Sequence, residues 1–289
     1  MPKIAIFYFS WSGNTEIVAN LFKSNFEARD CEVCFHRMDN IMRWKDYFKI
    51  DDCDLVGIIY PIHAFNAPRI VFEFIKNNLP KWVWKKAFII KSPGDPLFWW
   101  WSVALVRNKL KKKGYDIIYE DFVVMAANVF MRYKDSLVKQ LYETAKTRSK
   151  KIVDNIFSGK KKWEQPNPLL TITSWLFSFW ETFGSRYFWK TILKVNKLCV
   201  LCGKCVNECP TENITIKNDE ICFWRNCLLC LRCVYDCPKK AIEAKIWFSL
   251  VPRDLDVKAI IENENIDWNY LNSKSRGFYK RFYEYVGKS

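Results

Sequence analysis

The strongest constraint in the sequence is a cysteine pattern that occurs twice. The run Cys-x2-Cys-x2-Cys-x3-Cys-Pro begins at Cys199 and again at Cys227, 28 residues later. The surrounding text is also similar, with CVNECPTENI in the first copy and CVYDCPKKAI in the second. This spacing is typical of thiolates that hold iron–sulfur cubes. The pattern therefore predicts two [4Fe–4S] clusters on a duplicated half-domain.

Each predicted cube takes three thiolates from one run and a fourth, which precedes a proline, from the other run. The first predicted set is Cys199, Cys202, Cys205 and Cys237, and the second is Cys227, Cys230, Cys233 and Cys209. The alternative is a zinc domain, since thiolates also form tetrahedral zinc sites. Zinc sites pair two short C-x2-C knuckles and do not need two tandem runs of four, so the iron–sulfur interpretation is favoured.

Residues 199–244 resemble a bacterial-type ferredoxin with two [4Fe–4S] clusters, and they match at all eight ligands and both prolines. The resemblance implies a small α+β domain, placed at residues 196–246, that moves single electrons at low potential. We expect a cytoplasmic protein, because MPKIAIFYFS shows no export signal. A reducing compartment also favours metal ligands over disulfides for the twelve cysteines. Cys31, Cys34, Cys53 and Cys222 are interpreted as small hydrophobic residues.

The first part of the chain alternates apolar runs with helix-like patterns. Strands are expected at residues 3–9, 32–38, 54–60, 87–91 and 117–124, and helices at 15–26, 68–78, 102–112 and 136–157. Alternation of this kind predicts an α/β fold with a doubly wound parallel five-stranded sheet. Such sheets bind ligands beyond the carboxyl ends of their strands. The loops that follow the strands are therefore where a site is expected.

The loop after the first predicted strand is rich in hydroxyl groups and contains a glycine. It reads Ser10, Trp11, Ser12, Gly13, Asn14 and Thr15, directly before a predicted helix. Hydroxyls and backbone N–H groups at a helix N-terminus are suited to hold a phosphate. The loop has no lysine of the P-loop kind and no G-x-G-x-x-G, so neither ATP nor a dinucleotide is favoured.

This loop resembles the flavodoxin signature for the phosphate of FMN, and the resemblance covers residues 1–159. It implies FMN as a cofactor, with the loops after the third and fourth strands around the flavin ring. The ring contacts it implies are Tyr60, Pro61, His63, Phe65, Ser92 and Gly94, with Trp99, Trp100 and Trp101 at the edge. Core or interdomain packing is the alternative for each aromatic residue.

Two further segments carry no chemical motif. Residues 160–195 form an aromatic and basic connector, and residues 247–289 form a C-terminal tail expected to dock on the body of the protein. Packing between the domains is favoured for the connector over contact with a membrane surface. No apolar stretch reaches the length of a membrane-spanning helix.

The net charge of +15 bears on the choice of partner. Basic residues cluster at 109–113 and 146–151, which favours an acidic redox partner protein that is steered by charge. A solvated helix face is the plain alternative. Nucleic-acid binding is not expected, because no helix-turn-helix, RNP or finger pattern accompanies the charge.

Together the two parts resemble flavodoxin–ferredoxin fusion proteins of anaerobic bacteria and archaea. The resemblance implies a low-potential electron-transfer protein that relays electrons between FMN, two cubes and redox partner proteins. Two alternatives stay open: a flavin-dependent reductase of an unknown small substrate, and an FMN-free ferredoxin with a docking domain. No catalytic residue is singled out, and a carrier is favoured over an enzyme.

Overall fold

The larger unit of the protein is a five-stranded parallel sheet. The computed structural model describes the chain apart from residues 45–49, 64–65, 98–102, 128, 130, 164–171, 174–175, 177–178, 180–182, 185–186, 188–191, 245–254 and 289. The sheet has the order β2-β1-β3-β4-β5, and every neighbouring pair is parallel. The strands are β1 (Lys3–Tyr8), β2 (Glu32–Arg37), β3 (Leu55–Pro61), β4 (Lys85–Ser92) and β5 (Tyr115–Phe122). This is the flavodoxin-like order of doubly wound sheets, so the predicted fold class is confirmed.

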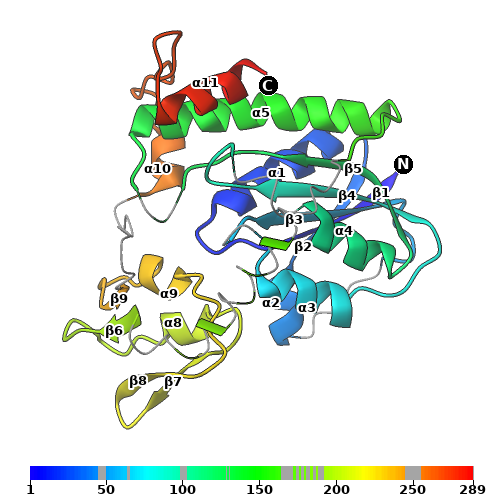
Figure 1. Ribbon diagram of the computed structural model, residues 1–289. Helices are drawn as coiled ribbons and strands as arrows, with labels where there is room; N and C mark the ends of the chain where they lie inside the picture. Colours follow the sequence, from blue (N-terminus) through cyan, green and yellow to red (C-terminus); the bar gives the residue numbers. More distant parts are fainter. Residues whose placement is uncertain are drawn as a thin grey trace.

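Helices cover both faces of this sheet, as Figure 1 shows. On one face lie α1 (Asn14–Glu27) and α5 (Asp135–Phe157), and on the other lie α2 (Met38–Trp44), α3 (Arg69–Asn77) and α4 (Val103–Lys111). The central strands are runs of β-branched and aromatic residues because both of their faces pack against helices. The helix α2 is absent from the sequence-based prediction, because it begins directly after β2 with no turn residue between them.

The larger unit extends past the boundary predicted at residue 159. The backbone N–H of Glu120 donates to the Lys162 carbonyl at 2.7 Å, and the Lys162 N–H donates to the Ile118 carbonyl at 3.3 Å. The Lys162 ammonium also pairs with Asp121 at 2.7 Å. The chain therefore runs beside β5 before it leaves this unit.

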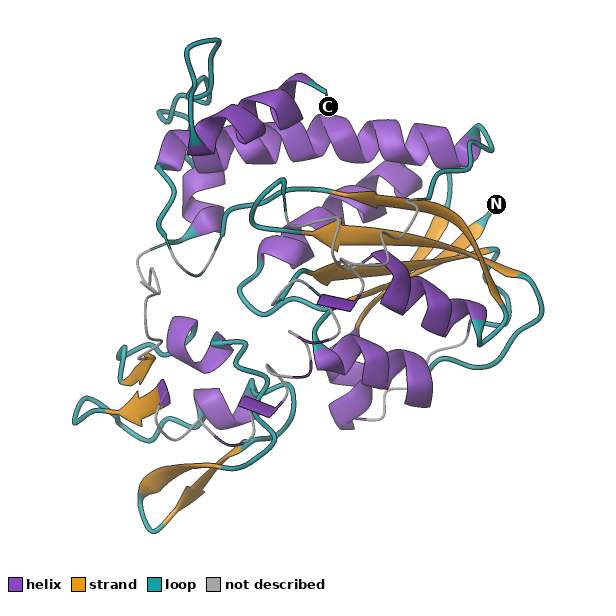
Figure 2. Cartoon of the chain, in the orientation of Figure 1, coloured by secondary structure: helices purple, strands orange, loops and turns teal. Residues whose placement is uncertain are grey.

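The smaller unit consists of short elements around the cysteine runs (Figure 2). Two antiparallel pairs frame it, β6 (Leu193–Val195) with β9 (Ile242–Ala244) and β7 (Ile214–Lys217) with β8 (Glu220–Phe223). One single-turn helix lies in each cysteine run, α8 (Lys204–Asn207) and α9 (Arg232–Tyr235). Figure 1 places this unit beside α2, next to one end of the large sheet.

After the smaller unit the chain returns to the larger one. The helices α10 (Val257–Glu262) and α11 (Phe278–Gly287) pack on α5 and β5 (Figure 1). Phe282 and Tyr285 are buried in the same core cluster as residues of α1 and α5. The Tyr285 hydroxyl accepts a hydrogen bond from the Val124 backbone N–H at 3.0 Å. The C-terminal segment thus completes the core of the larger unit.

Several described residues of the connector expose apolar side chains. These are Ile172, Leu176, Phe179, Phe183 and Tyr187. Their spacing of three or four residues places them on one face of a helix. Packing and surface contact both remain predictions for this segment. Among the described helices, none is both long and apolar enough to cross a bilayer.

Candidate functional site

The eight cysteines of the two runs divide between two pockets. The first, which we call the outer pocket, is lined by Cys199, Cys202, Cys205 and Cys237. The second, the inner pocket, is lined by Cys209, Cys227, Cys230 and Cys233. Each pocket thus brings together the four cysteines that the spacing assigns to one cube. Cys222 lies on β8 between residues that line the two pockets and is not among their lining residues.

The backbone around the two pockets repeats at the same 28-residue interval. Left-handed φ angles occur at Leu201 (52°) and Leu229 (50°), and again at Gly203 (73°) and Leu231 (59°). A left-handed residue other than glycine costs roughly 1–2 kcal/mol. The left-handed residues are nevertheless present in both copies, where Gly203 and Leu231 are the N-caps of α8 and α9.

Backbone N–H groups point at cysteine sulfur atoms in both copies. The Asn213 N–H donates to Cys209 Sγ at 3.2 Å, and its repeat counterpart, the Ala241 N–H, donates to Cys237 Sγ at 3.2 Å. Such bonds stabilise an anionic thiolate and tune the potential of an iron–sulfur centre. The donors therefore fit the thiolate ligands that a cube requires.

Burial sets the protonation of the metal-free thiols. It raises the pKa of Cys205 to about 11 and that of Cys227 to about 12. It raises the pKa of Cys230 to about 11, and it raises the pKa of Cys233 as well. Iron binds the thiolate, so cluster assembly has to displace these protons. Within the described residues, no group of three or more His, Cys, Asp or Glu side chains is spaced to hold a single ion.

The predicted phosphate loop joins β1 to α1. Gly13 has a φ of 92°, and its N–H donates to Ser10 Oγ at 3.1 Å, which closes the turn. Gly13 is the N-cap of α1 and supplies no side-chain cap. The start of a helix leaves backbone N–H groups without intrahelical acceptors, and an anion can satisfy them. Ser10, Asn14 and Thr15 are buried, whereas Trp11, Ser12 and Gly13 are partly exposed.

The loop after β3 lies against this phosphate loop. His63 and Asn66 exchange two backbone hydrogen bonds, at 2.7 and 2.8 Å, which makes a tight turn. The His63 ring packs edge-on against Trp11 with centroids 4.6 Å apart. Phe65, which the sequence places in the same loop, falls outside the described residues, as do Trp99, Trp100 and Trp101.

The remaining predicted ring contacts differ in their surroundings. Tyr60 is 0% exposed and belongs to the core cluster, and Pro61 is also buried, so the structure favours the packing alternative for Tyr60. Ser92 is buried, and its hydroxyl has no hydrogen-bond partner among the described residues. A Cβ on Gly94 would meet the Cβ of Ala127 at 2.9 Å, so only glycine fits there. The Ser92 hydroxyl and the uncapped start of α1 both fit a polar ligand at this edge of the sheet.

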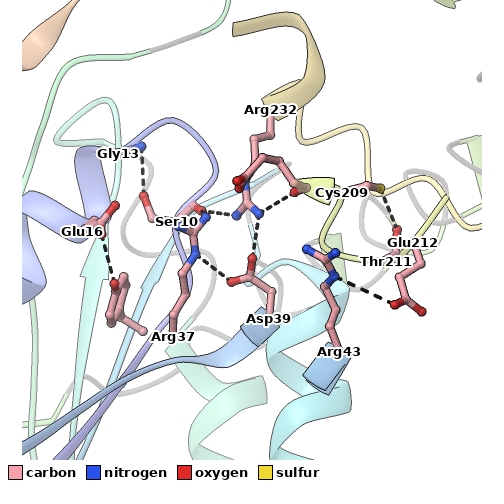
Figure 3. A network of polar contacts seen from close by, with 12 residues as sticks. Ser10, Gly13, Glu16, Arg37, Asp39, Arg43, Cys209, Thr211, Glu212 and Arg232 are labelled. Carbon is pink, nitrogen blue, oxygen red and sulfur yellow. Dashed lines mark hydrogen bonds and ion pairs between the residues drawn. The ribbon is translucent and has the colours of Figure 1, made fainter. Parts of the chain in front are cut away.

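A buried arginine of the smaller unit reaches the phosphate loop, as Figure 3 shows. Arg232 donates to Asp39 Oδ2 at 2.6 Å and to the Glu208 carbonyl at 2.9 Å. Its other terminal nitrogen donates to the Ser10 carbonyl. Arg37 holds the second oxygen of Asp39 at 3.0 Å and also donates to the Ser10 carbonyl at 3.2 Å. Sequence reasoning missed all three side chains, because Asp39 and Arg232 are 193 residues apart.

Two further contacts place the inner pocket at the same edge of the sheet. Leu228, a lining residue of that pocket, is 6% exposed and belongs to the core cluster of the larger unit, against which Trp11 and Ile62 pack. Arg69, at the start of α3, donates to the Asn226 side-chain oxygen at 2.7 Å. The inner pocket is therefore adjacent to the loops after β1 and β3.

The C-terminal helix holds the loop after β4. Arg281 of α11 pairs with Asp95. Tyr133 packs edge-on against Phe282 at 5.6 Å and donates from its hydroxyl to the Gly94 carbonyl at 2.7 Å. The loop that the sequence assigns to the flavin ring thus depends on α11 for its position.

Comparisons with known proteins cover both units. A 4Fe–4S binding domain family matches residues 193–215, which include the first cysteine run. No curated protein sequence matches the chain significantly. Solved structures similar to the larger unit include a flavodoxin from the domain Archaea, with 15% identity, a TM-score of 0.37, and coverage of 54% of this chain and 99% of the other.

Two other solved structures align over a similar range. Flavodoxin 2 from Bacillus cereus has 21% identity, a TM-score of 0.38, and coverage of 53% of this chain and 99% of its own. General stress protein 14 from Treponema denticola, in complex with FMN, has 13% identity, a TM-score of 0.39, and coverage of 55% and 99%. The strand order, rather than these likenesses, carries the fold assignment. The chain thus joins a unit with the flavodoxin-like strand order to a unit whose first cysteine run matches a 4Fe–4S binding domain family, and this combination supports an electron-transfer role.

Proposed function

We propose that this protein relays electrons along a fixed order of three centres: a cube in the outer pocket, a cube in the inner pocket and FMN at the carboxyl edge of the large sheet. The observation that carries the proposal is the position of the inner pocket. Its lining residues Leu228 and Arg232 touch the larger unit at the loops where a doubly wound sheet binds its ligand. The outer pocket, by contrast, includes the exposed Cys202.

Different loops of the large unit would hold the phosphate and the ring of FMN. The hydroxyls of Ser10, Ser12 and Thr15, with the N–H groups at the start of α1, would hold the phosphate. The loops around His63 and Ser92 would hold the ring. Bound FMN would supply a centre that exchanges one or two electrons, whereas each cube exchanges one. Leu228 and Trp11 pack in the same apolar cluster, which lies beside both the inner pocket and the phosphate loop.

The cysteines and the backbone of the small unit would hold the two cubes. Cys227, Cys230 and Cys233 would bind the inner cube together with Cys209, which accepts the Asn213 N–H. The same arrangement in the outer pocket uses the Ala241 N–H on Cys237. Both sets of thiolates lie in one compact unit, so single electrons can pass between them.

We assign the exchange with partner proteins to the outer pocket. Exposed lysines surround it, Lys204 and Lys239 among its lining residues and Lys240 next to them. The exposed Val200 adds an apolar contact. This rim fits an acidic redox protein, whose approach the overall positive charge would accelerate.

The deciding measurement is the cofactor content of protein reconstituted anaerobically. About eight iron and one FMN per chain are expected. About eight iron without FMN, even at excess flavin, would leave a ferredoxin with a docking domain and would contradict the relay. Stoichiometric zinc in place of iron and sulfide would contradict the cube assignment as well.

A second measurement separates a carrier from a flavin-dependent reductase. Reduced, fully loaded protein is offered a panel of small oxidants and, separately, oxidised ferredoxins or flavodoxins. A carrier reoxidises quickly with proteins and turns over no small molecule catalytically. Saturable turnover of one small molecule, lost in a Ser92→Tyr variant that fills the ring site, would favour the reductase.

A further inference from the structure

Arg232 occupies a special position between the two proposed redox centres. It lies between Cys230 and Cys233 in sequence and is itself a lining residue of the inner pocket. Its side chain is 2% exposed and crosses to the larger unit, where it meets Asp39 and the Ser10 carbonyl (Figure 3). One buried cation therefore contacts the phosphate loop and borders the inner pocket.

Acidic and basic groups both surround Arg232. Asp39, 1% exposed, is shared between Arg37 and Arg232, and the Asp236 carboxylate also acts on Arg232. Among the described residues, Arg232 is the only one of these charged groups that lines the inner pocket. In addition, the Arg232 Nε–H is buried and has no hydrogen-bond partner in the described part of the chain. A buried N–H without an acceptor is costly, and this one belongs to a residue that lines the inner pocket.

The duplicated half offers a direct contrast. The residue 28 positions earlier is Lys204, between Cys202 and Cys205 of the outer pocket. Lys204 is exposed to solvent, where water screens its charge. Arg232 acts in a buried environment, where a charge interacts more strongly with its neighbours.

We propose that the buried positive charge of Arg232 raises the reduction potential of the inner cube above that of the outer cube. The inference rests on the proposed function, because it requires a cube in the inner pocket. Reduction adds one negative charge to a cube, and a buried cation beside it stabilises the reduced form. Electrons that enter at the outer pocket then move toward the inner cube and the flavin loops.

The test is a redox titration of the full-length, anaerobically loaded protein, in which EPR reports each cube separately. Arg232→Gln removes the charge and is expected to lower the potential of the inner cube by about 60 mV or more, a tenfold change in a one-electron equilibrium. The potential of the outer cube is expected to stay unchanged. Arg232→Lys keeps the charge and is expected to retain most of the potential.

Two further variants protect the test against a loss of folding. Lys204→Gln is the matched control and is expected to shift neither potential measurably. Asp39→Asn removes the negative partner and is expected to shift the inner potential upward, opposite to Arg232→Gln. Equal shifts of both cubes in Arg232→Gln, no shift in either cube, or a downward shift in Asp39→Asn would overturn the inference.

The outcome is independent of flavin binding. A wild-type protein that loads iron but no FMN contradicts the relay, yet the potentials of its cubes still test Arg232. A wild-type protein that loads no iron contradicts the proposed function itself. Iron content and FMN content, measured first, therefore show which of the two statements has failed.

Discussion

The two halves of the cysteine repeat share a backbone but differ in their surroundings. Both contain left-handed residues at matching positions, and in both a backbone N–H donates at 3.2 Å to the cysteine that precedes a proline. Val200 of the outer half is 59% exposed, whereas its counterpart in the inner half, Leu228, is 6% exposed. The two copies thus share one ligand geometry, and they differ in burial because Leu228 of the inner half packs in the core of the larger unit.

The substitutions between the halves follow this contrast. Where the outer half has Gly203 and Lys204, the inner half has Leu231 and Arg232, both buried. Leu231 keeps a left-handed φ of 59° although glycine would adopt it more easily. Its side chain packs in the core of the small unit, which offsets that cost. At this position the inner half therefore has a buried apolar side chain, whereas the outer half has a glycine that adopts the left-handed conformation without strain.

The largest expected effect is the selective loss of one cube. Cys209→Ala should remove the inner cube and spare the outer one, because Cys209 lines only the inner pocket. Cys237→Ala should do the reverse. Iron analysis should find about four iron per chain in each variant, and EPR should show which signal remains. If Cys209→Ala instead removed the signal of the outer cube, the crossed assignment would be wrong.

A smaller effect is expected from a matched pair of apolar truncations. Leu228→Ala should cost about 2–5 kcal/mol of unfolding free energy, because it leaves a cavity in the core of the larger unit. Val200→Ala, at the corresponding exposed position, should stay within about 0.5 kcal/mol of the wild type. Denaturant unfolding of both variants provides the measurement. Equal costs would mean that the halves do not differ in the way described.

The phosphate loop should respond to the loss of one hydroxyl. Thr15→Ala should weaken FMN binding by about 1.5–3 kcal/mol, the range for a hydrogen bond to a charged group. Fluorescence titration of the apoprotein measures this change. Thr215→Ala, in the small unit on β7, is a control that should leave FMN affinity unchanged. Unaltered affinity in Thr15→Ala would count against the phosphate loop.

The smallest expected effect concerns the exposed part of the contact between units. Arg69→Ala removes the hydrogen bonds to Asn226, and we expect a loss of about 0.2–1 kcal/mol, as for other exposed charged contacts. The effect should shrink at high salt, whereas that of Leu228→Ala should not. Thermal unfolding at two salt concentrations checks both statements, and a large, salt-independent effect of Arg69→Ala would refute this ranking.

Local patterns were sufficient to predict much of this structure. The continuous apolar runs of β1 and β3 predicted buried parallel strands, and the structure contains them. The cysteine spacing predicted two sets of four, and each set lines one pocket. These features depend on residues close in sequence, or on a repeat, so periodicity and spacing reveal them.

Such local patterns could not predict the contacts between residues far apart in the sequence. The sequence around Asp39 does not indicate that its partner is Arg232. The helix α2 was also not predicted, because it follows β2 without a turn residue between them. The flavodoxin resemblance implied Tyr60 as a ring contact and left core packing as the alternative; its complete burial in a core cluster favours packing. The repeat did align Arg232 with Lys204, yet only the packing of the units shows that one is buried and the other exposed.

The return of the chain to α5 through α10 and α11 has a consequence for electron transfer. The small unit is tethered at both of its ends to the same body, as an insertion would be. If the contacts around Arg232 opened, the two tethers would keep the inner pocket near the flavin loops at a high effective concentration. Re-docking would then be an intramolecular event, independent of protein concentration, and dilution would not separate the centres.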